Sequence, residues 1–100
     1  MTSPRVLPES EADWERVVVD LAAFRGWRRY HPFLSVRSAH GFPDETLVRP
    51  PRVVFAELKS ERGRLTVAQR EWLGLLADCP GVEVYVWRPS DWPDVQRILA

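Results

Sequence analysis

Glu57 and Lys59 are the two residues whose spacing first indicates chemistry in this sequence. They stand two positions apart in the apolar segment Val53 to Lys59. If that segment is a β-strand, alternate side chains share a face, so the carboxylate and the ammonium lie on the same side. A charged pair on an otherwise apolar strand is costly unless it is paired or used. A same-face ion pair at the end of a sheet remains an alternative explanation.

Asp44 makes a catalytic interpretation stronger. It lies thirteen positions before Glu57, at the start of a predicted strand that turns back around two prolines. Counting outward from this turn, Arg49 faces Arg52 and Asp44 faces Glu57. Two carboxylates at neighbouring strand ends repel each other unless a cation lies between them, and hard oxygen ligands suit Mg²⁺ or Mn²⁺. The alternative is that Asp44 only closes a Pro-Asp turn.

Lys59 is the only lysine among the 14 basic residues, all the others being arginines. Lysine is a compact point charge that can lose its proton when desolvated, whereas arginine cannot. A lone lysine beside two carboxylates therefore fits a role in which arginine would not serve.

The elements that must position these residues follow from periodicity and capping. Apolar residues at helical spacing begin after Ser10 and end at Gly26, and Thr66 with Gln69 forms a capping-box signature for a second helix. We expect a helix from Ser10 to about Phe24, an extended segment at 27–34, a loop at 35–43, strands at 45–48 and 52–59, a helix at 66–78, a strand at 82–87 and a short helix after Ser90. This order, α-β-β-β-α-β-α, predicts an α/β fold with a central mixed sheet flanked by helices.

Composition limits the other possibilities. One hundred residues, 45% of them hydrophobic, predict a single domain over 1–100, with 1–9 as a frayed N-terminal tail. One cysteine excludes an internal disulfide and a cysteine-based zinc site. No apolar run is long enough for a membrane span or typical of a signal peptide, so we expect a cytoplasmic protein with no membrane partner.

The order and spacing of these motifs resemble the PD-(D/E)XK nucleases, and in particular the VRR-NUC branch, the virus-type replication-repair nucleases. The resemblance covers about Ser10 to Leu99, and no single motif in it is specific. It rests on Ser10-Glu-x-x-Trp-Glu15 leading to Gly26-Trp27, Gly41-Phe-Pro-Asp44, Ala56-Glu-Leu-Lys59, Thr66-x-x-Gln69-Arg-Glu-Trp72, and the closing segment 82–92. Glu45 is a departure, because an apolar residue usually follows the aspartate; it would add charge beside the metal site.

The resemblance implies a restriction-endonuclease-like fold and a role for each site residue. Asp44, Glu57 and the backbone carbonyl of Leu58 would hold Mg²⁺ or Mn²⁺, with no organic cofactor. Lys59 would orient the attacking water or stabilise charge on the phosphate. Gln69 matches a glutamine beside the active site, although the capping box alone would explain it. The helix glutamate of such nucleases would be Glu11 or Glu15, and a surface-charge role is equally open for each.

The implied function is a metal-dependent, structure-selective DNA endonuclease. Stand-alone proteins of this branch tend to act as homodimers on branched DNA such as Holliday junctions, so the resemblance implies a homodimer, and we expect it in a bacterial or phage-infected cell. The alternatives are a phage-type nicking or flap nuclease, a catalytically inactive DNA-binding module of the same fold, and a domain with no nucleic-acid partner. The acid-free stretch 21–43 supplies the candidate DNA contacts, namely Arg37, Arg28, Arg29 and His40.

Overall fold

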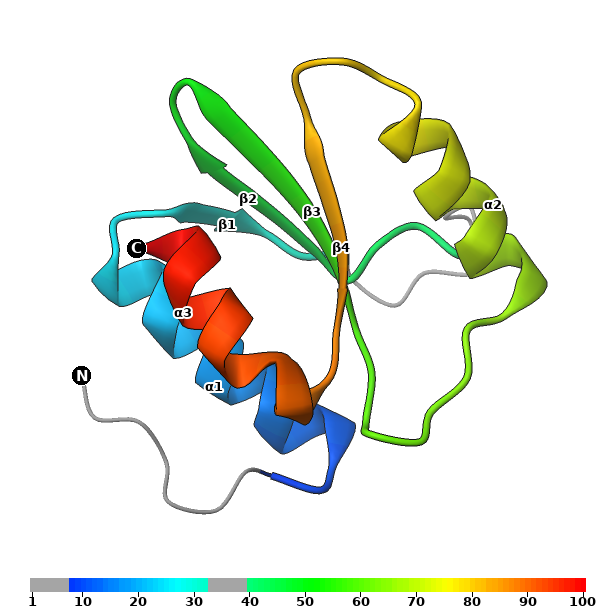
Figure 1. Cartoon of the computed structure of the whole chain (residues 1–100), viewed down its shortest axis with the longest axis horizontal. Helices are drawn as coiled ribbons and strands as arrows, with labels where there is room; N and C mark the ends of the chain where they lie inside the picture. Colours follow the sequence, from blue (N-terminus) through cyan, green and yellow to red (C-terminus); the bar gives the residue numbers. More distant parts are fainter. Residues whose placement is uncertain (1–7, 33–39) are drawn as a thin grey trace.

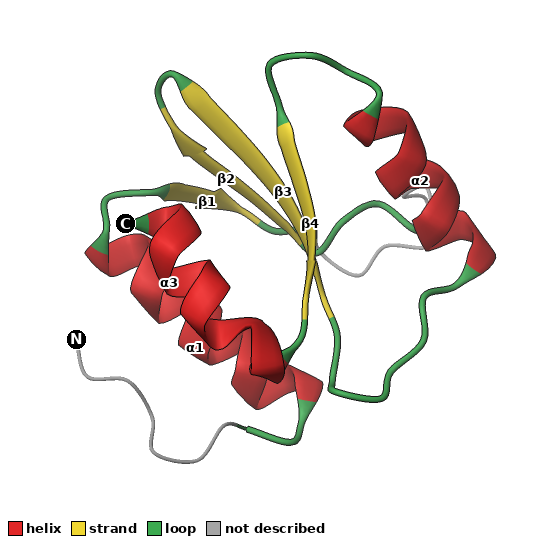
Figure 2. Cartoon of the chain, viewed as in Figure 1, coloured by secondary structure: helices red, strands yellow, loops and turns green. Residues whose placement is uncertain are grey.

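A four-stranded mixed sheet with helices on both faces forms the fold (Figures 1 and 2). The computed structural model describes residues 8–32 and 40–100. Its elements follow the expected order: α1 (Glu11–Phe24), β1 (Arg28–Tyr30), β2 (Glu45–Arg49), β3 (Arg52–Leu58), α2 (Val67–Ala77), β4 (Glu83–Trp87), the 3₁₀ turn η1 (Pro89–Asp91) and α3 (Trp92–Leu99). The α/β class and the order α-β-β-β-α-β-α are thus confirmed. The predicted fraying of 1–9 falls mostly on residues outside the described ranges.

The strands lie in the order β1-β2-β3-β4, with the first three antiparallel and β4 parallel to β3. Arg49 pairs with Arg52 across the β2–β3 turn and Glu45 pairs with Ala56, as counted from the sequence. Extending this register by one residue places Asp44 opposite Glu57.

The hydrophobic core lies between the sheet and the helices α1 and α3, which pack on the same face (Figure 1). Ser10 caps α1 by accepting from the Asp13 backbone N–H at 3.1 Å, and Gly26 follows the helix with a φ of 81°. Two tryptophan indoles connect the layers: Trp14 Nε1 donates to the Trp87 carbonyl at 2.9 Å and Trp27 Nε1 to the Leu99 carbonyl at 3.0 Å. The strand face towards this core carries Leu47, Val54, Ala56 and Leu58, all fully buried.

The opposite face of the sheet is covered by α2 (Figures 1 and 2). Its packing depends on Phe42, whose ring lies 5.9 Å from that of Phe55 on β3 and 5.1 Å from that of Trp72 on α2, both edge to face. The preceding residue, Gly41, has a φ of 90°, and a Cβ there would lie 2.4 Å from the Ala68 backbone. Only glycine therefore lets the loop before β2 approach α2 this closely.

Within the described part of the predicted extended segment 27–34, pairing with β2 is limited to Arg28–Tyr30. Pro32 has no N–H to donate to a neighbouring strand, which explains why pairing stops before it. Residues 33–39, and with them most of the predicted loop at 35–43, lie outside the described part of the chain. Among the described helices, none combines the length and apolar character needed to cross a bilayer.

Candidate metal centre

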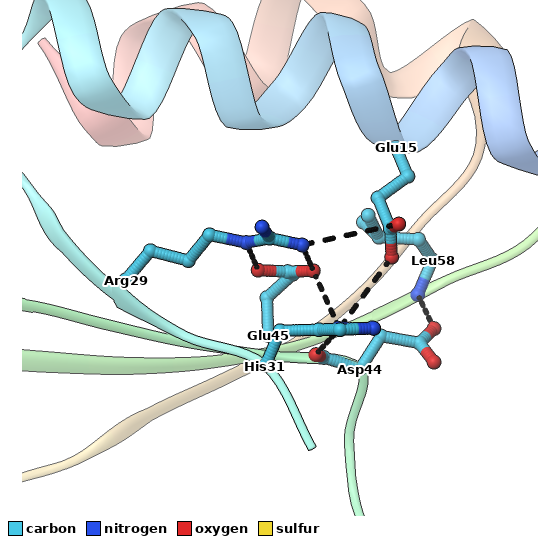
Figure 3. Close-up of polar contacts among 6 residues, drawn as sticks. All are labelled: Glu15, Arg29, His31, Asp44, Glu45 and Leu58. Atoms are coloured by element: carbon cyan, nitrogen blue, oxygen red, sulfur yellow. Dashed lines mark hydrogen bonds and ion pairs between the residues drawn. The ribbon is translucent and has the colours of Figure 1, made fainter. Parts of the chain in front are cut away.

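Asp44 and Glu57 meet at the end of the β2–β3 hairpin. Oδ2 of Asp44 accepts a hydrogen bond from the Leu58 backbone N–H at 2.9 Å (Figure 3). This side-chain hydrogen bond extends the pairing of β2 with β3 beyond their last backbone pair. The Asp44 and Glu57 carboxyl groups are close enough for a hydrogen bond between them. The N–H and carbonyl of one strand residue point to the same side, so the Leu58 carbonyl also faces the Asp44 side of β3.

Glu57 is a buried acid with incomplete hydrogen bonding. It is 1% exposed, and its Oε1 is buried without a hydrogen-bond partner among the described residues. Burial, followed by repulsion from Asp44, raises the pKa of Glu57 to about 8. In the protein without metal, Glu57 therefore retains its proton near neutral pH.

Lys59 and Gln69 complete the surroundings of Glu57 Oε2. Lys59 Nζ lies 3.6 Å from Oε2, with its side chain only 11% exposed, and Gln69 Nε2 donates to the same oxygen at 3.0 Å. Lys59 and Glu57 thus share a face of β3 near Gln69 of α2, as the strand alternation predicts.

Gln69 has both of the roles that the sequence left open. Its Oε1 accepts the Thr66 backbone N–H at 2.8 Å and its backbone N–H donates to the Thr66 hydroxyl at 3.1 Å, which is a complete capping box. Because the cap occupies the amide oxygen, the NH₂ group is directed at Glu57. The cap and the contact with Glu57 therefore depend on one side-chain orientation.

This donor set fits a hard divalent cation. Two carboxyl groups converge, one from the residue before β2 and one from β3, and a strand carbonyl faces the same side. One of the two has a buried oxygen without a hydrogen-bond partner in the described part of the chain. Oxygen ligands of this kind are what Mg²⁺ and Mn²⁺ prefer. A cation between the carboxylates would offset the repulsion that now raises the Glu57 pKa.

A second polar group lies around Glu45 and was not foreseen as a group from the sequence. The ligand atoms of Glu15, His31 and Glu45 all lie within 4.8 Å of one another, so these residues could hold a metal ion. Glu45 is fully buried and points to the α1 side of the sheet, away from Glu57. His31 Nδ1 lies 3.1 Å from Glu45 Oε2 and 2.7 Å from the Asp44 carbonyl, so the group adjoins the Asp44 backbone (Figure 3).

Arg29 already supplies this second group with a cation. Its Nε and Nη2 donate to the two Glu45 oxygens at 2.5 and 2.9 Å, a bidentate ion pair that raises the pKa of Arg29 (Figure 3). Burial and the nearby Glu45 carboxylate raise the pKa of Glu15. Glu45, which stands where the resemblance led us to expect an apolar residue, is thus paired with the Arg29 guanidinium. A metal ion here would have to share Glu45 with this guanidinium, and an imidazole ligand would favour a transition metal over Mg²⁺.

The remaining candidate residues are divided. Of the two helix glutamates, Glu15 lies in the second group, whereas Glu11 is exposed in the first turn of α1 and takes no part in either group. Arg28 and His40 are exposed, and Arg29 is bound to Glu45. Arg37 lies outside the described residues.

Comparison with known proteins adds no family to this geometry: no family model, no curated protein and no solved structure matches the chain.

Proposed function

We propose that this protein is a metal-dependent DNA endonuclease that hydrolyses phosphodiester bonds at the Asp44–Glu57–Lys59 centre. The observation that supports it most strongly is the meeting of the Asp44 and Glu57 carboxyl groups, with Glu57 Oε1 buried and accepting no hydrogen bond from any residue in 8–32 or 40–100. The order and spacing of its motifs resemble the VRR-NUC branch of the PD-(D/E)XK nucleases, and we propose membership of that branch.

Each residue has a role that its contacts support. Asp44, Glu57 and the Leu58 carbonyl would bind Mg²⁺ or Mn²⁺, which would supply Lewis-acid chemistry for hydrolysis of the phosphodiester by water. Lys59, 3.6 Å from Glu57 Oε2, would stabilise the negative charge that develops on the phosphate. Gln69 holds the Glu57 carboxylate in place through its 3.0 Å hydrogen bond. The His31 contact with the Asp44 carbonyl fixes the backbone from the other face of the sheet.

For the substrate we propose branched DNA, cut by a homodimer in the cytoplasm of a bacterial or phage-infected cell. One small domain has one cutting centre, whereas resolution of a four-way junction requires two paired nicks, which a symmetric dimer provides. This substrate proposal rests on the resemblance and on symmetry.

The test is a cleavage panel of duplex, single-stranded, flap and four-way-junction DNA with Mg²⁺ or Mn²⁺. Asp44→Asn is the best variant, because the amide oxygen can still accept the Leu58 N–H while the charge that binds a cation is removed. Asp20→Asn, an exposed aspartate on α1, is the matched control. We expect cutting by the wild type and the control and none by Asp44→Asn. Equal cutting by all three would refute the assignment; binding without cutting by the wild type would indicate an inactive module.

A further inference from the structure

The loop between β3 and α2 lines an open cleft beside the candidate metal centre. Its volume is about 490 Å³, and it is lined chiefly by basic side chains: Glu61, Arg62, Gly63, Arg64, Leu65, Arg70 and Arg88. Four of these lining residues are arginines and one is a glutamate. Of the arginines in 21–43, the three that the structure describes (Arg25, Arg28 and Arg29) do not line this cleft.

Arg88 builds the cleft. Its Nη1 donates to the backbone carbonyls of Ser60 at 2.7 Å, Glu61 at 3.3 Å and Gly63 at 2.6 Å. Carbonyls orient the guanidinium without neutralising it, so Arg88 both shapes the loop and adds positive charge. The carboxylate of Glu61 is turned to the Ser90 backbone N–H, at 3.2 Å.

The other three arginines have no acidic partner among the residues that the structure describes. Arg62, Arg64 and Arg70 are exposed, and no ion pair joins any of them to a carboxylate in the described ranges 8–32 and 40–100. Arg70 also lies in the first turn of α2, a turn without acidic residues, where the positive end of the helix dipole disfavours a cation. Like charges gathered without counter-charges disfavour the fold locally, so their placement is explained best by an anionic ligand.

The cleft is continuous with the centre that contains Asp44 and Glu57. Gly63 packs against Lys59, since a Cβ on Gly63 would lie 3.5 Å from the Lys59 Cδ. On the α2 side, Arg70 follows Gln69, whose amide contacts Glu57. A chain of phosphates that has one member at Lys59 would therefore continue over the loop into the cleft.

We propose that Arg62, Arg64 and Arg70 form a docking surface for the sugar-phosphate backbone of a nucleic acid strand, with Arg88 holding its shape. The identity of that strand as the one being cut rests on the proposed function, whereas binding itself is independent of cleavage. Such contacts position the strand without reading its sequence.

Binding is tested without metal, in EDTA, by fluorescence anisotropy of a labelled four-way junction and a labelled duplex between about 50 and 200 mM KCl. The variant carries Arg62→Ala, Arg64→Ala and Arg70→Ala together. A matched control with the same loss of net charge carries Arg16→Ala, Arg25→Ala and Arg97→Ala, three exposed arginines on α1, after α1 and on α3. Circular dichroism and thermal unfolding verify that both variants are folded.

We expect the cleft variant to lose about three units from the slope of log K against log salt, about one for each phosphate contact removed. The control should lose far less. Equal slopes in the cleft variant and the control, or no binding by the wild type, would overturn the inference. Binding with the expected slope but no cleavage by the wild type in Mg²⁺ would refute the proposed nuclease and leave the docking surface standing. Cleavage by the wild type with an unaltered slope in the cleft variant would refute the docking surface and leave the proposed nuclease standing.

Discussion

Glu57→Gln gives the most quantitative prediction, because it removes a carboxyl group whose proton makes the stability depend on pH between 4.5 and about 8. The pKa of Glu57 is raised from 4.5 to about 8 by burial and by Asp44. The folded protein without metal therefore retains a proton that the unfolded chain has released between these pH values. The free energy of unfolding must fall as pH rises through this window, by about 1.4 kcal/mol per pH unit and about 4 to 5 kcal/mol in total.

Glutamine has the shape of the protonated acid and cannot ionise. Its oxygen can accept from Gln69 and its NH₂ can face Asp44, so the variant should keep the fold. We expect equal stability of wild type and variant near pH 4.5, and a growing advantage of the variant that reaches several kcal/mol at pH 8. Removal of a buried carboxylate from a site without metal should thus stabilise the protein while it abolishes metal binding.

The assay is urea unfolding in EDTA at a series of pH values from about 4.5 to 8.5, repeated in Mg²⁺. Glu71→Gln, an exposed glutamate on α2, is the control and should follow the wild type. Mg²⁺ should stabilise the wild type at high pH, where the ion replaces the proton, and leave Glu57→Gln unchanged. Parallel pH profiles for the wild type and Glu57→Gln would show that no proton is held there, and the reasoning would be refuted.

The other predictions concern neighbouring contacts. Arg29→Met should cost about 3 kcal/mol of folding free energy, because it leaves the fully buried Glu45 carboxylate without its main partner. Glu45→Gln should cost about 1 kcal/mol, because the arginine that it leaves can reach water. Equal costs of the two variants in urea unfolding would contradict this order. Lys59→Arg should cleave DNA at least about 100-fold more slowly, because a broad planar guanidinium does not place its charge at a single point as the ammonium does. Wild-type rates would show that positive charge alone suffices. Gln69→Ala should weaken Mg²⁺ affinity by about 10-fold through loss of the hydrogen bond to Glu57, measured by calorimetry; unchanged affinity would leave Gln69 with its capping role alone.

The sequence predicted the fold because local signals and the hydrophobic pattern agree along most of the chain. Ser10 and Thr66 cap the helices that they were expected to cap, and the β2–β3 register could be counted from the turn because pairing in a short hairpin leaves little freedom. The same alternation placed Glu57 and Lys59 on one face.

The surroundings of the site were harder to foresee, because they depend on long-range contacts. Glu45 stood out as a carboxylate at an apolar position, but only the pairing of β1 with β2 shows that Arg29 and His31 reach it. The arginine cleft was missed because its residues come from the loop after β3, from α2 and from the position after β4, and no sequence period relates Arg88 to the carbonyls that it contacts. An arginine-rich loop directly after the Glu-x-Lys strand was the available signal.

Direct binding of Mn²⁺, followed by electron paramagnetic resonance, tests the central claim that Asp44 and Glu57 trap a divalent cation. Binding at this centre is distinguished from binding at the Glu15–His31–Glu45 group by two variants. Asp44→Asn alters the proposed centre, and Glu15→Gln alters the other group. We predict one bound ion in the wild type, retained by Glu15→Gln and lost from Asp44→Asn. Retention of the ion by Asp44→Asn, or its loss from Glu15→Gln alone, would contradict the account.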